Sequence, residues 1–330
     1  MTRVLVTGGA GYVGAVLVPK LLGAGFEVTV LDLYLYGEDV LDAVKDHPGL
    51  RQVKGDLRDT DLLHRILPGC EAVVHLACIS NDPSFELDPQ LGKSINYDAF
   101  RPLVEASRRQ GARRFVFASS SSVYGVKEED RVTEELPVAP LTDYSRYKAL
   151  CEEILLEYQA PRFAWTILRP ATVCGYSPRL RLDLTVNILT SQAVKQRRIR
   201  VLGGTQYRPN IHIEDMADVY LQVLQLPEER VAGKIWNVGY ENLTVLEITE
   251  KVRRVVDDPG LEIVREPTAD LRSYRVDSQR IQQDIGFAAR HTVEDAVRDL
   301  LAAFRSGRIP DPLNDPRYYN IRTMQAVGLK

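Results

Sequence analysis

The sequence predicts an α/β protein with a doubly wound parallel sheet, followed by a smaller C-terminal α+β lobe. In the first half of the 330 residues, apolar runs of strand length alternate with segments of helical periodicity. The runs are almost continuously apolar, which is typical of parallel strands that are buried on both faces. A glycine-rich turn joins the first run to the first helical segment. These three observations together indicate a sheet covered by helices on both sides.

The expected strands of the first half are six apolar runs, at residues 3–8, 27–33, 50–57, 71–77, 113–122 and 163–170. Helical segments separate them, for example residues 12–25 and 94–111. A seventh run at residues 234–239 resembles the others and is expected to rejoin the sheet. After Pro170, proline, glycine and arginine become more frequent. We therefore expect the sheet domain to span residues 1–170, and residues 171–330 to form mostly the smaller lobe and a C-terminal tail.

The composition excludes several classes of protein. The formal net charge is −3, so no overall basic field points to nucleic acid, and the basic run 195–200 is interpreted as a solvated helix end. No apolar stretch is long enough to span a membrane, and the N-terminus is a strand and not a signal sequence. The cysteine spacing indicates no metal site and no disulfide framework, as expected for reduced thiols in a cytoplasmic protein.

The glycine turn has the spacing of a dinucleotide-binding site. Gly9, Gly11 and Gly14 match G-x-G-x-x-G, and Gly8, Gly11 and Gly14 match the G-x-x-G-x-x-G variant. The turn follows an expected strand and opens an expected helix, so bare backbone and the positive helix end can approach a pyrophosphate. The alternative is a tight strand–helix turn that serves packing only.

Two acidic residues end the next expected strands. Asp32 lies 18 residues after Gly14, where a carboxylate accepts hydrogen bonds from ribose hydroxyls and repels a 2′-phosphate. This favours NAD over NADP. Asp56 ends the third strand, where it can meet the adenine; the alternative role for Asp56 is to cap the helix that follows.

Tyr144 and Lys148 are four residues apart in "TDYSRYK" and share one face of an expected helix that Thr142 or Asp143 caps. Tyr147 points about 100° away from Lys148. A phenol has a pKa of about 10, so a tyrosine base needs a nearby cation to lower that pKa. The pair is therefore a candidate base with its activating group, the alternative being a surface pair.

Seven short motifs occur in a characteristic order: "TGGAGYVG", "GDL", "HLA", "SINYDAF", "SSSSVYG", "LRPATVCG" and "YRPNIHIEDMADVY". Together with Asp32, Tyr144 and Lys148 they resemble the extended short-chain dehydrogenase/reductases that act on nucleotide sugars. The resemblance runs over nearly all of the chain. It implies a Rossmann domain with NAD as cofactor, a nucleotide-sugar substrate, and a homodimer formed by the helices near residues 96–109 and 144–158.

The resemblance also implies roles for individual residues. Tyr144 falls on the catalytic base that takes a proton from a sugar hydroxyl, Lys148 on its lysine, and Ser120 on the hydroxyl that orients the reacting oxygen. Arg208 falls on the arginine that holds the substrate pyrophosphate, and Asn96 on an asparagine that lines the site. The implied cofactor-binding residues are Gly8, Gly11, Tyr12, Val13, Gly14, Asp32, Leu33, Asp56, Leu57, Leu76, Ala77, Cys78, Asn96, Ser119, Tyr144, Lys148 and Ala171.

The reaction is less closely defined by the motifs. The dehydratase branch has an acid pair where this chain has Ser121 and Ser122, which disfavours elimination of water. The epimerase branch has an asparagine at the position of Thr172 and a lysine at that of Ser80. We expect C4 epimerisation of an NDP-hexose; the alternatives are a 4-ketosugar reductase, a uronic acid decarboxylase, or a non-catalytic NAD(H) sensor or scaffold. Three further candidates, with either substrate contacts or structural salt bridges as their role, are Asn187, Arg272 and Arg275.

Overall fold

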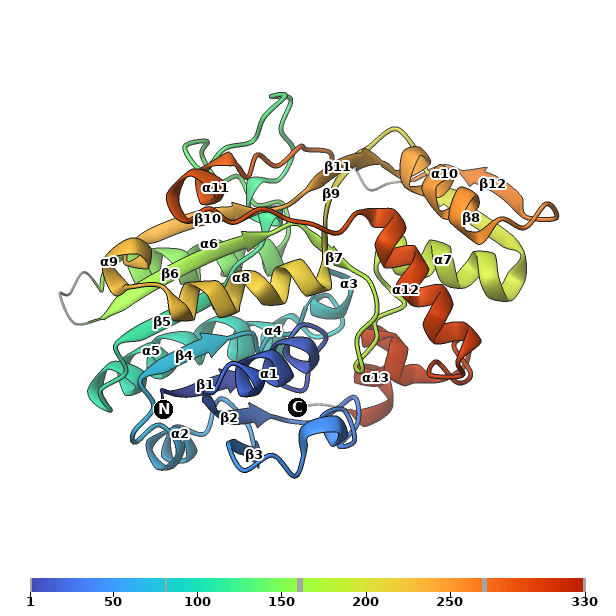
Figure 1. Ribbon diagram of the computed structural model, residues 1–330. Helices are drawn as coiled ribbons and strands as arrows, with labels where there is room; N and C mark the ends of the chain where they lie inside the picture. The colour runs from blue at the N-terminus through green and yellow to red at the C-terminus, as the bar shows by residue number, and fades with distance from the viewer. Residues whose placement is uncertain (1, 81, 159–162, 269–271, 329–330) are drawn as a thin grey trace.

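The computed structural model describes residues 2–80, 82–158, 163–268 and 272–328, and its central sheet has seven parallel strands (Figure 1). Their order across the sheet is β10-β6-β5-β4-β1-β2-β3. All seven apolar runs expected from the sequence are strands of this sheet, including the late one. The strands are β1 (Arg3–Thr7), β2 (Glu27–Asp32), β3 (Leu50–Lys54), β4 (Ala72–His75), β5 (Arg114–Ala118), β6 (Ala164–Pro170) and β10 (Lys234–Val238).

Helices cover both faces of this sheet. On one face α1 (Gly14–Gly23) and α8 (Ile213–Gln225) lie side by side, and on the other lie α2 (Thr60–Ile66), α5 (Phe100–Arg109) and α6 (Asp143–Leu156). Alternate strand residues supply the two cores: Val4 and Val6 face α1, whereas Leu5 faces the opposite layer. Because α8 belongs to the sheet domain, the chain after residue 170 returns to this domain with a helix as well as with β10.

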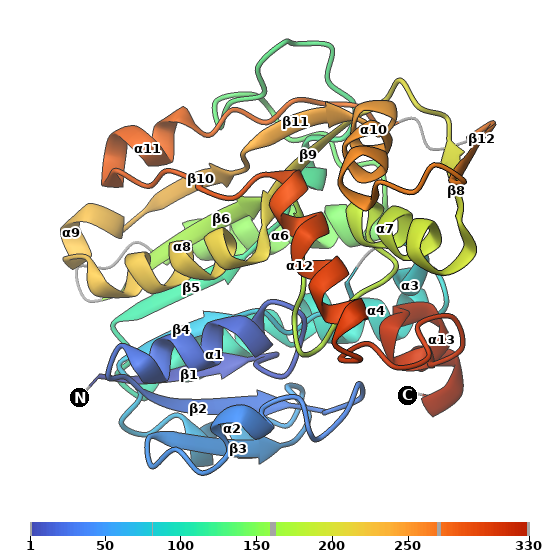
Figure 2. The same ribbon diagram turned by 45° about the vertical axis from the view of Figure 1, so that its right-hand side comes forward.

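The smaller lobe contains two short sheets and three helices that pack on one another (Figure 2). One sheet has the order β11-β9-β7 and the other pairs β12 with β8. The basic run is only partly a helix end: Lys195 and Gln196 end α7, whereas Arg198 and Arg200 belong to β8 and form ion pairs with Glu262 and Glu266. The elements of the lobe are β7 (Thr172–Cys174), α7 (Thr185–Gln196), β8 (Arg198–Leu202), β9 (Tyr207–His212), β11 (Glu241–Thr244), α10 (Val245–Val256), β12 (Glu262–Glu266) and α12 (Val293–Arg305).

The C-terminal tail folds back onto the rest of the protein. It ends in α13 (Asn320–Val327), which contacts the short helix α3 (Figure 2). Within the described ranges, every helix is too short or too polar to cross a membrane. The remaining short elements are η1 (Asp42–Val44), α3 (Asp82–Phe85), α4 (Pro89–Lys93), the π-helix η2 (Ser94–Asp98), η3 (Ser121–Tyr124), α9 (Glu228–Val231), α11 (Gln279–Ile285) and η4 (Pro316–Tyr318).

Candidate active site

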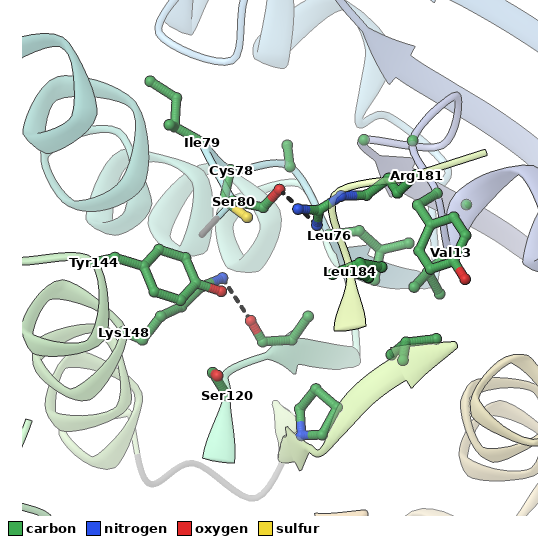
Figure 3. A pocket seen from close by; sticks show the side chains of 18 of the residues that line it. Val13, Leu76, Cys78, Ile79, Ser80, Ser120, Tyr144, Lys148, Arg181 and Leu184 are labelled. Carbon is green, nitrogen blue, oxygen red and sulfur yellow. Dashed lines mark hydrogen bonds between the residues drawn. The ribbon is translucent and has the colours of Figure 1, made fainter. Parts of the chain in front are cut away.

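A cavity of about 460 Å³ opens at the carboxyl ends of the central strands. It lies where the strand order reverses between β1 and β4, the position at which ligands bind in open parallel sheets. The glycine turn lines one part of it, and Ser120, Tyr144 and Lys148 line another. The cavity thus brings together the two groups of residues that the motifs singled out (Figure 3).

The glycine turn is shaped for close approach of backbone. Gly8 has φ +74°, and a Cβ there would lie 2.6 Å from the backbone nitrogen of Ala77. A Cβ on Gly14 would lie 2.5 Å from the carbonyl oxygen of Gly9. Helix α1 begins at Gly14 without a side-chain cap, so the positive end of its dipole is open to an anion. This cradle fits the diphosphate of a dinucleotide.

Asp32 connects the end of β2 to the glycine turn. Its carboxylate accepts hydrogen bonds from the amides of Ala10 at 2.9 Å and Tyr34 at 2.8 Å, and it lines the cavity. Burial raises the pKa of Asp32 above its usual value, and the two amide bonds act against that rise. A carboxylate in this position fits ribose hydroxyls.

Asp56 also lines the cavity, and it forms an ion pair with Arg58 at 2.7 Å. The cap of α2 is Asp59 and not Asp56, because the Asp59 side chain accepts the amide hydrogen of Leu62. The alternative role that the sequence allowed for Asp56 is therefore wrong.

The start of α6 directs Tyr144 and Lys148 into the cavity. Thr142 and Ser145 form a reciprocal capping box, so the helix begins as the sequence predicted. The Lys148 Nζ donates a hydrogen bond to the carbonyl of Ala118 at 2.7 Å and lies 5.9 Å from the centre of the Tyr144 ring (Figure 3). Tyr147 is not among the lining residues, and its ring packs on Phe85 and Tyr97.

Ser120 follows β5 and faces the same space as Tyr144 (Figure 3). Its Oγ lies 2.8 Å from the Oγ of Ser122, while the hydroxyl of Ser121 lies 3.2 Å from that of Tyr274. The two positions after Ser120 therefore carry hydroxyls that interact with neighbouring hydroxyls, and no acid.

A buried ion pair supports this wall of the cavity, and the sequence motifs did not reveal it. Glu152 of α6 and Arg169 of β6 are 4% and 5% exposed, and their side chains lie 2.6 Å apart. Glu152 also accepts a hydrogen bond from Ser119, and Arg169 donates one to Tyr124. The network holds the ends of β5 and β6 against α6.

Asn96 is not among the residues that line the cavity, and its expected contact with the cofactor stays a prediction. Its amide oxygen accepts the N–H of Ile79 at 2.8 Å, and its amide nitrogen donates to the carbonyl of Ile79 at 2.9 Å. Asn96 thereby fixes the loop after β4, whose residues 76–80 do line the cavity. It acts on the site through that loop.

Asn187 does not reach the cavity either. Its side chain is fully buried and bonds the backbone of Gly175 and Arg181 and the hydroxyl of Tyr12. These bonds connect the lobe to the glycine turn, and a contact between Asn187 and the substrate stays a prediction.

The expected arginines separate into two groups. Arg208 of β9 and Arg272 both line the cavity. Arg275 is not among the lining residues; it pairs with Asp130 and stacks on the ring of Tyr207 at 4.7 Å. For Arg275 the structural alternative holds. The other expected cofactor residues, which all line the cavity, are Gly8, Gly11, Tyr12, Val13, Gly14, Leu33, Leu57, Leu76, Ala77, Cys78, Ser119 and Ala171.

Two lining arginines, Arg179 and Arg181, were not predicted to bind a ligand. They come from "SPRLRLDL", a stretch in which the R-x-R-x-D pattern was visible but could not be placed relative to the glycine turn. Among the described residues, no cluster of His, Cys, Asp and Glu has the form of a metal site, and the four cysteines are free.

Comparison with known proteins decides the family. The model of the NAD dependent epimerase/dehydratase family matches residues 4–239. The chain belongs to this family. This family is NAD-dependent, and the resemblance to the extended short-chain dehydrogenase/reductases is confirmed.

Relatives in this family catalyse more than one reaction. The chain is 30% identical to a dTDP-glucose 4,6-dehydratase of Streptomyces griseus, over 93% of this chain and 95% of the relative. It is 27% identical to the UDP-glucose 4-epimerase of Bacillus subtilis, over 90% and 95%. The dTDP-glucose 4,6-dehydratase DesIV of Streptomyces venezuelae, solved with NAD and TYD bound, superimposes with a TM-score of 0.85 at 26% identity, over 95% of this chain and 100% of that one. The similarity to these relatives therefore supports a nucleotide-sugar epimerase or dehydratase and does not distinguish between the two reactions.

Proposed function

We propose that the protein is an NAD-dependent nucleotide-sugar epimerase that inverts C4 of an NDP-hexose through a transient 4-keto intermediate. One observation favours epimerisation over dehydration, the two activities named for the relatives. Ser121 and Ser122, the residues after Ser120, present hydroxyls where elimination of water would need an acid. Because these two described positions hold no carboxylic acid, they favour epimerisation at C4 over loss of a sugar hydroxyl as water.

The proton chemistry is assigned to three side chains. Tyr144 takes the proton of the C4 hydroxyl, and the Lys148 ammonium 5.9 Å from the ring centre stabilises the phenolate that does so. Ser120 donates a hydrogen bond to the same sugar oxygen and holds it in line. NAD bound along the glycine turn would supply the acceptor, and then the donor, of the hydride at C4. Arg208 and Arg272 line the cavity and are assigned to the substrate diphosphate.

The presence of all three groups argues against a non-catalytic NAD(H) sensor or scaffold. A binding protein has no use for a tyrosine, a lysine and a serine of these types lining the same cavity. A 4-ketosugar reductase and a uronic acid decarboxylase use the same proton chemistry, and they differ from the epimerase in what happens to the dinucleotide and to the sugar carbon skeleton.

The test is to incubate the purified protein with UDP- and dTDP-hexoses in D₂O and to follow the sugars by proton NMR. An epimerase forms the C4 epimer with no deuterium on carbon and no added reductant, because hydride returns from the cofactor. Mass spectrometry of the dinucleotide released on denaturation should give NAD(H). A product with deuterium at C5 and a 6-methyl group would contradict the proposal, and so would empty sites with NADPH-dependent consumption of a 4-ketosugar, or release of carbon dioxide from an NDP-uronic acid.

We also propose that the protein is a homodimer that pairs α5 and α6. Leu156 of α6 is 43% exposed, and Arg101 of α5 forms a bidentate ion pair with Glu157 just beyond the end of α6. Light scattering should give twice the chain mass of 37.1 kDa at micromolar concentration. A monomer mass would contradict the pairing.

A further inference from the structure

Two arginines of the loop between β7 and α7 are buried beside the cavity with donors left over. Arg179 is 4% exposed and Arg181 is 8% exposed, and both line the cavity. Among the described residues, the Nε and Nη1 of Arg179 and the Nη2 of Arg181 have no hydrogen-bond partner. Burying guanidinium donors without acceptors is costly, so these nitrogens indicate a ligand that supplies acceptors.

This loop is bound directly to the glycine turn. The Tyr12 hydroxyl donates to the carbonyl of Gly175 at 2.7 Å, and the Ser177 hydroxyl donates to the carbonyl of Tyr12 at 2.7 Å. Asn187 then joins the Tyr12 hydroxyl to the carbonyl of Arg181, at 3.1 Å and 2.8 Å. The two arginines are therefore held next to the part of the cavity that the glycine turn lines.

The C-terminal helix closes over the same arginines. Asn320, the first residue of α13, accepts a hydrogen bond from Arg179 and donates one to the Ser80 hydroxyl at 2.8 Å. Its backbone N–H donates to Asp183, which is the carboxylate that pairs with Arg181 at 2.9 Å. Arg181 also donates to the Ser80 hydroxyl at 3.2 Å, across the cavity (Figure 3).

The local charge favours an anion. Arg181 has Asp183 as its counter-ion, whereas Arg179 stacks on the ring of Tyr36, with 3.5 Å between the guanidinium carbon and the ring centre. Burial lowers the pKa of Arg179 to about 10, so it remains a cation at neutral pH. A diphosphate has two negative charges and free acceptor oxygens, and arginine forks bind such oxygens in pairs.

We propose that Arg179 and Arg181 bind the diphosphate of NAD, which the start of α1 holds from the glycine turn, and that α13 locks this clamp so that the cofactor stays bound. The inference rests on the NAD site of the family and not on C4 epimerisation. The diphosphate of a nucleotide sugar has the same chemistry, so the experiment separates the two sources.

The test is titration calorimetry of the full-length protein after its dinucleotide is removed, with NAD and UDP as separate ligands. Arg179→Gln and Arg181→Gln should each weaken NAD binding on the order of 10- to 100-fold and leave UDP binding within about twofold. Arg208→Gln should give the opposite pattern. Arg253→Gln, which removes an exposed arginine paired with Glu250, is the matched control and should change neither affinity.

A second variant keeps both arginines and their packing. Asn320→Asp places a carboxylate on Arg179, which then competes with the diphosphate, so NAD binding should weaken while the melting temperature without ligand changes little. Loss of UDP affinity with unchanged NAD affinity would assign the arginines to the substrate and overturn the proposal. Unchanged affinities for both ligands in folded Arg181→Gln and Asn320→Asp would reduce the arginines to a structural role and overturn it as well. Because no sugar turnover is measured, failure of the epimerase reaction would not affect either result.

Discussion

Replacing Tyr144 by phenylalanine tests the assignment of the base with the smallest possible change. The ring that lies 5.9 Å from the Lys148 Nζ stays in place, and only the hydroxyl at the cavity wall is lost. Removing a general base typically costs about 10²–10⁴-fold in rate, so a loss of about 10³-fold corresponds to roughly 4 kcal/mol of transition-state stabilisation. NAD affinity should change by less than about threefold, because most of the lining residues are untouched.

The matched control is Tyr147→Phe on the same helix. The Tyr147 ring centre lies 5.6 Å from that of Phe85 and 5.4 Å from that of Tyr97, away from the cavity lining. Its turnover should stay within about twofold of the wild type, and its stability within about 0.5 kcal/mol. Both variants are compared by initial rates of sugar interconversion and by NAD titration.

Two results would refute this reasoning. A Tyr144→Phe enzyme that keeps a tenth of the wild-type turnover would show that another group takes the proton. A Tyr147→Phe enzyme that is the slower of the two would show that the i,i+4 relation to Lys148 does not select the base.

Three further predictions concern the glycine turn, the buried ion pair and a buried histidine. Gly14→Ala should abolish NAD binding measured by calorimetry, because its Cβ would lie 2.5 Å from the carbonyl oxygen of Gly9. Wild-type NAD affinity in this variant would show that the backbone of the turn can move to accommodate a side chain. Glu152→Gln should cost about 3–5 kcal/mol in urea unfolding, because Arg169 would stay buried without a counter-charge; a cost below about 1 kcal/mol would contradict it. Burial lowers the pKa of His75 from 6.5 to about 3. Between these pH values His75 is protonated in the unfolded chain and neutral in the folded protein. The free energy of unfolding should therefore fall by up to about 1.4 kcal/mol per pH unit below pH 6.5. His75→Gln should flatten that slope in urea titrations at several pH values, and equal slopes would contradict the assignment.

Local patterns were sufficient to predict the strands and the common position of Tyr144 and Lys148. The inner strands of the sheet are buried on both faces, so their residues are mostly apolar, and the run 234–239 could be recognised by the same property although it comes late in the chain. The edge strand β3 is the exception, because its Arg51 and Gln52 are exposed. Tyr144 and Lys148 belong to one helix, whose geometry fixes their common face from spacing alone. Glycine positions in the turn were likewise predictable, because the motif specifies where a side chain cannot be placed.

By itself, the sequence thus determined the fold class, the NAD turn with Asp32, and the roles expected of Ser120, Tyr144 and Lys148. Only the tertiary structure showed that Asn96 and Asn187 hydrogen-bond the backbone of neighbouring loops, and that Arg179 lines the cavity. The reason is physical. Strands, the glycine turn and the Tyr144–Lys148 spacing depend on neighbours a few residues away in the sequence. The hydrogen bonds of a buried amide or guanidinium depend on donors and acceptors that the fold brings from distant parts of the chain. Asn320, for example, meets Arg179 across 141 residues of chain. Composition and periodicity report burial and local conformation, and they contain no measure of such distant pairings.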